Sequence, residues 1–173
     1  MSHDKKMHMS SFVRSFFSFF DKKIILLQLL MSNSIFSDGS SRIKASISHI
    51  NSLDDAKFKK LLQRIAEKAG RQNETIFTLE ELNKLENAFG LSIDDIKQMI
   101  ETIEYMFLQS AYHLVKPQIL QNDLINEQNF DENKATIFVE QWSTNAKEII
   151  ERLKTSHIAS HSVNRSILSS SCL

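Results

Sequence analysis

From residue 41 onward, the apolar residues of the chain recur with the period of an α-helix. Ile43, Ile47 and Ile50 are four and three positions apart, a spacing that places them on one helix face. The next stretch repeats this spacing and ends at Gly70, because glycine readily takes the left-handed backbone that closes many helices. Its apolar face consists of Phe58, Leu61, Leu62, Ile65 and Ala69. The pattern therefore predicts two consecutive helices.

A third helix has a predictable beginning and end. Thr78 and Glu81 have the spacing of a capping box, in which a hydroxyl and a carboxylate each accept a hydrogen bond from a free backbone amide. Gly90 is expected to stop this helix. Its buried stripe is expected to consist of Leu79, Leu82, Leu85 and Phe89.

The stretch from Ser92 to Val115 is apolar on most of its sides. Ser92 and Asp95 form a weaker capping pair at its start. Pro117 lacks an amide hydrogen and disfavours helical geometry in the residue before it, so the helix is expected to end or kink there. A helix that is apolar on most sides is surrounded by other helices. The central, core-forming residues are expected to be Ile96, Ile100, Ile103 and Phe107.

Two more helices complete the predicted fold. A fifth carries Ile119, Leu120, Leu124 and Ile125, and a sixth has a broad apolar face between Ala135 and Leu153. The sequence thus predicts an all-α, compact bundle of about six helices around a central apolar helix. We expect this domain to span residues 41–154.

The segments 1–40 and 155–173 differ in composition from the domain. The first holds two apolar runs, FFSFF at 16–20 and IILLQLLM at 24–31, and the three charged residues between them are too costly for a membrane-spanning helix. We expect an extension that is disordered or not native to the domain; alternatively, translation begins at Met31. The last 19 residues hold seven Ser and one charged side chain, and a disordered tail is expected.

Composition narrows the function classes. The 21 basic and 21 acidic residues cancel, which removes the overall attraction to nucleic acid or anionic membrane. The single Cys172 excludes a disulfide scaffold and favours a reducing, cytoplasmic compartment. With three Gly and one Pro, the chain lacks the glycine-rich loops that hold phosphates.

No residue is a convincing catalytic candidate. The sequence holds no GxSxG turn, and Cys172 lies in a Ser-rich tail with no packed surroundings to lower its pKa. The carboxylate pairs at 80–81 and 94–95 fall in first helical turns, where negative charge complements the helix dipole. We therefore predict that the protein is not an enzyme and needs no cofactor.

Metal binding has weak support. His157 and His161 are four residues apart, but their surroundings give little reason to be helical. His3 has the position of a copper(II) ligand next to a free amino terminus, an arrangement that removal of Met1 would disrupt. We expect no metal site, and these histidines remain open alternatives.

One helix face is strongly basic. It holds Lys57, Lys60, Arg64 and Lys68. Such a face can bind phosphates of RNA or lipid, but no aromatic residue interleaves with it for base stacking, and a row of this kind is more often solvated. The alternative is a solvated face, or one opposite an acidic neighbour, since residues 42–70 carry seven basic and three acidic residues and residues 71–104 carry three and eight.

Two segments resemble a known family. ETIEYMFLQSAYHLVKPQILQNDL at 101–124 and ATIFVEQWS at 135–143 are similar to the COMM domain-containing protein family. The resemblance includes the downstream Leu120 and Leu124 and the spacing from Phe138 and Val139 to Trp142. It also includes the residues that we take as candidate partner-binding residues: Tyr112, His113, Lys116, Pro117 and Trp142. For Trp142, a place in the core is the first expectation and a partner contact the second.

The resemblance implies a helical amino-terminal domain that is normally followed by a COMM domain, through which family members pair. It further implies a non-catalytic scaffold subunit of the Commander assembly, which joins coiled-coil subunits and recycles membrane cargo. Family members are also linked to NF-kappaB signalling and to cullin-RING ubiquitin ligases. The expected location is cytoplasmic, peripheral to endosomes, with the nucleus as a further site.

The sequence departs from the family pattern after Lys154. Where a COMM domain is expected, the chain continues as TSHIASHSVNRSILSSSCL, without the alternation typical of strands. We therefore expect a truncated family member that consists of the helical domain. Its partners are expected to be other COMM domain-containing proteins and coiled-coil subunits, and the alternative function is a freestanding module that binds anionic lipid or RNA through the basic face.

Overall fold

The computed structural model describes residues 35–36, 41–71 and 74–169, except for the side chains of 156–169. This part of the chain is helical and contains no strand. Its helices are α3 (Ser41–Ser52), α4 (Asp55–Lys68), α5 (Leu79–Phe89), α6 (Ile93–Tyr112), α7 (Pro117–Asn126) and α8 (Glu132–Ser169). The prediction of an all-α bundle of about six helices is confirmed.

The helix starts follow from local hydrogen bonds. The Thr78 amide donates to Glu81 Oε2 at 2.8 Å, and the Glu81 amide donates to Thr78 Oγ1 at 3.3 Å. This is the predicted capping box of α5. The Asp95 amide donates to Ser92 Oγ at 3.2 Å at the start of α6. Gly90 closes α5 with a φ of 67°, in the left-handed region.

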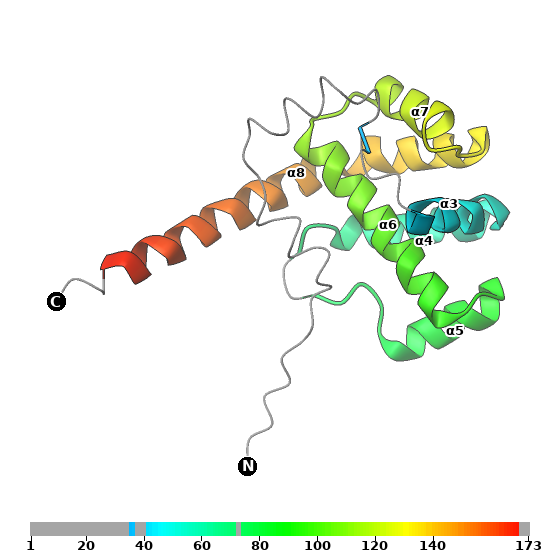
Figure 1. Ribbon diagram of the computed structural model, residues 1–173, viewed down its shortest axis with the longest axis horizontal. Helices are drawn as coiled ribbons and strands as arrows, with labels where there is room; N and C mark the ends of the chain where they lie inside the picture. The colour runs from blue at the N-terminus through cyan, green and yellow to red at the C-terminus, as the bar shows by residue number, and fades with distance from the viewer. Residues whose placement is uncertain (1–34, 37–40, 72–73, 170–173) are drawn as a thin grey trace, which may run out of the picture.

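Helix α6 lies at the centre of the bundle, as its apolar composition predicts. It packs against α3, α4, α5 and α8, while α7 packs on α8 (Figure 1). Helices α4 and α8 form the most extensive contact between two elements. Two hydrogen bonds also join α3 to the loop between α7 and α8. The Asn51 side-chain amide donates to the Asn129 carbonyl at 2.9 Å, and the Asp131 backbone amide donates to Asn51 Oδ1 at 3.1 Å.

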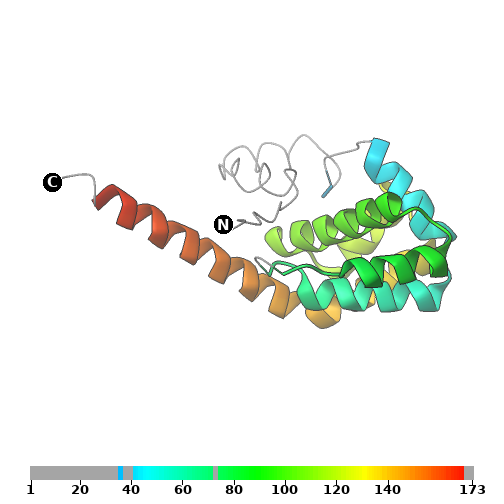
Figure 2. The ribbon, with the colours of Figure 1, turned by 90° about the horizontal axis from the view of Figure 1, so that it is seen from below.

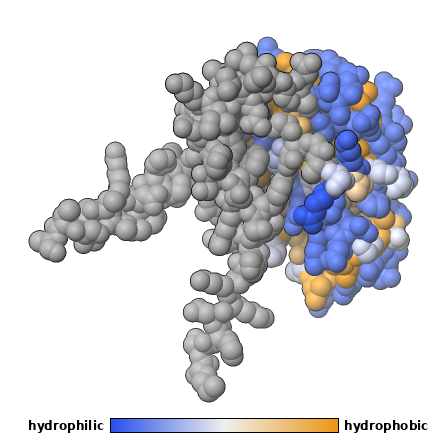
Figure 3. Space-filling model, in the orientation of Figure 1, coloured by the Kyte–Doolittle hydropathy of each residue, from blue (hydrophilic) through white to orange (hydrophobic). Residues whose placement is uncertain are grey.

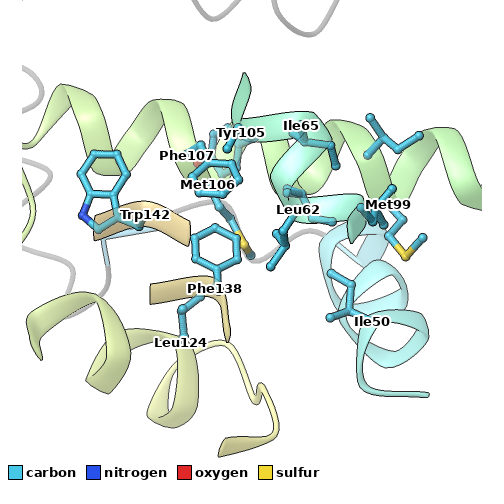
Figure 4. Packing of buried hydrophobic residues seen from close by; sticks show 14 of the residues in the cluster. Ile50, Leu62, Ile65, Met99, Tyr105, Met106, Phe107, Leu124, Phe138 and Trp142 are labelled. Carbon is cyan, nitrogen blue, oxygen red and sulfur yellow. The ribbon is translucent and has the colours of Figure 1, made fainter. Parts of the chain in front are cut away.

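The core is aromatic where α6 meets α8. The Phe107 and Phe138 rings stack with centroids 4.6 Å apart, and Phe130 meets Phe138 edge-on at 6.2 Å. Figure 4 shows Phe107, Met106 and Phe138 gathered between α6 and α8. Full burial of such side chains contributes about 1.5–3 kcal/mol each. The predicted core residues of α6, Ile96, Ile100, Ile103 and Phe107, are all buried.

The amino-terminal boundary of the domain differs from the expected position at residue 41. Phe36 is buried in the core, with its ring 6.3 Å from that of Tyr105. The Ile35 amide donates to Asp123 Oδ1 of α7 at 3.1 Å. The chain therefore joins the bundle before α3 begins, although the Ser-rich context of these residues gives no periodic signal.

The last helix is longer than the predicted end near residue 154. The backbone of α8 continues to Ser169, so residues 155–169 are helical rather than irregular. No Gly or Pro occurs between residues 132 and 169, and nothing in the local sequence breaks the helix. Its final part extends away from the other helices (Figures 1 and 2).

None of the helices in the described part of the chain is both long and apolar enough to cross a membrane. The apolar runs at 16–20 and 24–31 lie outside the described residues.

Candidate partner-binding surface

Helix α6 ends in a tight turn before α7. The Val115 amide donates to the Ser110 carbonyl at 2.9 Å, and the Leu114 amide donates to the Ala111 carbonyl at 3.3 Å. This pair of bonds is the Schellman motif, in which the residue after the cap takes the left-handed conformation. That residue here is Leu114, with a φ of 51°. Pro117 then begins α7, where its missing amide hydrogen costs nothing.

Leu114 has two unfavourable properties. A residue with a Cβ in the left-handed region carries a strain of about 1–2 kcal/mol, which is why glycine prevails at this position. Its side chain is also 65% exposed. Ile119, on the first turns of α7, is 55% exposed. Lys116, Pro117 and Gln118 between them are exposed as well. We define the corner surface as Leu114, Lys116, Pro117 and Ile119.

The corner surface is supported from below by α8. Val115 is buried, and its carbonyl accepts a hydrogen bond from the indole Nε1 of Trp142 at 3.1 Å. Trp142 is only 2% exposed and lies with the other core side chains in Figure 4. It fixes the position of the corner and is not accessible to a partner.

The other candidate partner-binding residues lie at the end of α6. The rings of Tyr112 and His113 meet edge-on, with centroids 5.1 Å apart, and both residues are half-buried. Burial lowers the pKa of His113. Together with the corner surface, these residues form one continuous stretch of chain from α6 into α7. Their role in binding stays a prediction.

The basic face has partners within the domain. Lys57 donates to the Ala88 carbonyl at the end of α5 at 2.8 Å, and Lys68 donates to the Thr75 carbonyl at 3.0 Å. Arg64 pairs with Glu81 of α5 at 3.4 Å. Lys60 is exposed. Three of the four basic side chains therefore bind acceptors in the acidic section 71–104. This is the alternative in which the basic face lies opposite an acidic neighbour.

A buried lysine was not recognised from the sequence. Lys134 of α8 donates to the Leu53 carbonyl and to Asp55 Oδ1, and its ammonium lies 5.6 Å from the centroid of the Phe58 ring. Its side chain is 4% exposed. In the sequence, its burial is indicated only by its position four residues before Phe138, which places both residues on the same face of the helix.

A second polar junction joins α4, α6 and α8. Arg152 donates to the carbonyls of Ala66 and Ala69 at 3.1 and 3.2 Å. These bonds satisfy carbonyls at the end of α4 that lack partners within the helix.

The Glu104 carboxyl of α6 lies at the same junction. Burial raises its pKa, while a hydrogen bond from the Gly70 amide opposes this shift. Gly70 has a φ of 77° and lies against Leu108.

Metal and catalytic candidates gain no support. Among the described residues, no group of three or more His, Cys, Asp or Glu side chains is placed to hold a metal ion. His3, Cys172 and the side chains of His157 and His161 lie outside the described residues. Glu81 acts as a cap, and its hydrogen bond from the Thr78 backbone lowers the pKa of its carboxyl.

Comparison with known proteins identifies the bundle. Residues 37–142, more than half of the chain, match the family described as "COMMD2-7/10, HN domain". The chain belongs to the COMM domain-containing protein family. The match runs from just after Phe36 to Trp142 and so covers α3 to α7, the first part of α8 and the corner surface. It confirms the resemblance seen in the sequence, which is to the helical domain.

A curated relative supports the same conclusion. COMM domain-containing protein 10 of Dictyostelium discoideum is 33% identical to this chain over 135 residues. The aligned region covers 78% of this chain and 63% of that relative. The chain thus spans less than two thirds of the length of this relative.

Proposed function

We propose that this protein is a non-catalytic interaction subunit that binds other COMM domain-containing proteins and coiled-coil subunits of a Commander-type assembly. In this role it serves the recycling of membrane cargo and acts in the cytoplasm at the endosomal surface, with a nuclear pool as a further location. Regulation of NF-kappaB signalling and of cullin-RING ubiquitin ligases belongs to the same proposal. Family membership supports the general role.

The observation that carries the proposal is the conformation and exposure of Leu114. Glycine at this position would remove the backbone strain, and a polar residue would avoid the exposed apolar surface. Strained residues persist mainly where function requires them. A partner that buries Leu114 and Ile119 would gain about 25 cal/mol per Å² of apolar surface removed from water. The corner surface is therefore the proposed contact with an apolar helix of another subunit.

The alternative function, binding of anionic lipid or RNA, loses support from the contacts of the basic face. Lys57, Arg64 and Lys68 have acceptors within the domain. A phosphate would have to compete with these acceptors, and Lys60 alone gives little affinity at physiological salt.

Affinity capture tests the proposal. The tagged full chain, a Leu114→Gly variant and a Leu79→Ala variant are expressed in cells, and the co-purified COMM domain-containing proteins and coiled-coil subunits are quantified by mass spectrometry. Leu79 is 66% exposed, close to the 65% of Leu114, so the expectation that it belongs to the buried stripe of its helix is wrong. It lies on α5, at the opposite side of the bundle from α7 in Figure 1. It is therefore a matched control for loss of an exposed leucine.

Two outcomes are decisive. We expect Leu114→Gly to reduce capture of family members about tenfold, which corresponds to about 1.4 kcal/mol of lost binding free energy. Leu79→Ala should leave capture unchanged. Absence of all family members from the unmodified chain's sample, or equal loss in both variants, would refute the proposal.

A further inference from the structure

The chain enters the bundle next to the corner surface. The Ile35 amide binds the Asp123 carboxylate at 3.1 Å, and Phe36 is buried against Tyr105. The short blue segment 35–36 lies beside α7 in Figure 1. Asp123 follows Ile119 by four residues, which is about 6 Å along the axis of α7. The backbone at Ile35 is therefore fixed about one helical turn from an exposed residue of the corner surface.

An apolar run lies immediately upstream of this anchor. Residues 24–31, IILLQLLM, contain no charged side chain and only one polar one, Gln28. Met31 is four residues before Ile35, so the run begins within about 14 Å of the anchor even if the intervening chain is fully extended. Eight residues cover a further 12 Å as a helix or about 27 Å when extended.

The corner surface lies within this reach. Leu114 and Ile119 are five residues apart, so their Cα atoms are separated by at most about 18 Å. A run of eight residues that begins within about 14 Å of Ile35 and covers up to about 27 Å can therefore contact both side chains. The run and the corner surface are also both mainly apolar. Lys116 is the single charged residue of the corner surface, and the run contains none.

From these relations we propose that residues 24–31 pack on the corner surface of the same molecule and cover Leu114 and Ile119. The tether through Ile35 gives the run an effective concentration in the millimolar range, which a separate partner does not have. The inference rests on the proposed function because it concerns the same surface. The run then acts as an intramolecular competitor, and a partner subunit must displace it.

Photo-crosslinking of the full chain tests this contact. The photoreactive residue p-benzoylphenylalanine replaces Leu114 in one protein and Ile119 in a second, and the crosslinked peptides are identified by mass spectrometry. In a control protein it replaces Leu79. We expect crosslinks from positions 114 and 119 into residues 24–31, and none into that run from position 79. A mixture of ¹⁴N- and ¹⁵N-labelled protein separates contacts within one molecule from contacts between two copies.

A variant with charges in the run provides the second measurement. Leu27→Asp combined with Leu30→Asp should abolish these crosslinks, because carboxylates are costly to place against an apolar surface. The same variant should bind partner subunits about tenfold more tightly if the run covers the surface in nine molecules of ten. Circular dichroism of each protein verifies that the bundle remains folded.

The outcomes separate the two proposals. Crosslinks from positions 114 and 119 that avoid residues 24–31, or that join two copies, overturn the intramolecular contact. If those crosslinks form but Leu114→Gly leaves partner capture unchanged, the contact stands and the proposed partner surface is wrong. If capture depends on Leu114 and no crosslink to the run forms, the proposed function stands and this inference is overturned.

Discussion

The indole of Trp142 on α8 donates a hydrogen bond to the backbone carbonyl of Val115, with 3.1 Å between Nε1 and the oxygen. This bond joins the last helix to the turn between α6 and α7. Because Val115 directly follows Leu114, the bond fixes the strained residue from which the corner surface projects. The tryptophan thus serves the proposed binding surface without being part of it.

Replacement of Trp142 should therefore disturb the corner more than the rest of the bundle. We expect Trp142→Phe to lower the free energy of unfolding by about 2 kcal/mol, because it leaves the buried Val115 carbonyl without its donor and creates a small cavity. Urea unfolding followed by circular dichroism measures this loss. Hydrogen exchange should accelerate at residues 113–116 in Trp142→Phe.

A change in the neighbouring core is the control for this local effect. Phe138→Leu also removes aromatic volume, but Phe138 packs on Phe107 and Phe130 and makes no bond to the corner. It should lower stability without selective acceleration of exchange at residues 113–116. Equal acceleration in both variants would show that Trp142 does not hold the corner in particular.

The backbone strain at Leu114 can be tested in both directions. Leu114→Gly should leave the stability unchanged or raise it by up to about 1 kcal/mol, because it relieves the left-handed conformation at some cost in chain entropy. Gly90→Ala should lower the stability by about 1 kcal/mol, because Gly90 has a φ of 67°. An added Cβ would meet nothing within 4 Å, so the loss would report the backbone strain alone. Thermal unfolding of both variants measures these changes. A marked loss of stability in Leu114→Gly would mean that the leucine side chain contributes to the fold.

Local signals explain why both ends of α5 and the starts of α6 and α7 were predictable from sequence. The capping box at Thr78, the left-handed Gly90 and the proline that begins α7 each act through their immediate neighbours. The apolar period of α6 likewise reports its central position, because burial on several sides requires apolar residues on several sides. These features need no knowledge of tertiary contacts.

Features set by tertiary contacts were not predictable. Phe36 is buried because α6 and α7 offer it a site, and its own Ser-rich surroundings show no period. Lys134 occupies a buried position because Leu53, in the loop before α4, and Asp55, the first residue of α4, supply acceptors. Leu114 takes the left-handed conformation at the end of α6, whereas a sequence rule would place glycine there. The corner surface therefore required the structure.

The buried Lys134 should contribute strongly to stability. In Lys134→Met the apolar stem is kept, but the Leu53 carbonyl loses its donor and Asp55 its partner. We expect a loss of about 1–3 kcal/mol, mainly from the carbonyl, because Asp55 is 54% exposed and remains hydrated. Lys59→Met is the matched control, since Lys59 pairs with Glu140 at 3.3 Å at the surface. That change should cost less than about 1 kcal/mol. Similar losses in urea unfolding of both variants would contradict the proposed importance of burial.

Glu104 should make the stability depend on pH in an unusual direction. Burial raises the pKa of its carboxyl in the folded state, so the folded protein holds this proton more tightly than the unfolded chain. The contribution of Glu104 to stability is therefore fully present below its ordinary pKa of about 4.3 and is lost as the pH rises through the raised value. Glu104→Gln removes this titration and keeps an oxygen that accepts from the Gly70 amide. We expect the variant to be more stable than the unmodified protein at pH 7.5.

This difference between the variant and the unmodified protein should shrink as the pH falls toward 4, since both proteins then carry a neutral side chain at position 104. Urea unfolding at a series of pH values measures it. Glu67→Gln controls for loss of one negative charge, because Glu67 is exposed on α4. The opposite result would be a Glu104→Gln variant that is less stable than the unmodified protein at pH 7.5, with the difference shrinking toward pH 4. The charged carboxylate would then be the favoured form at the junction of α4, α6 and α8. The hydrogen bond from Gly70 would then outweigh burial.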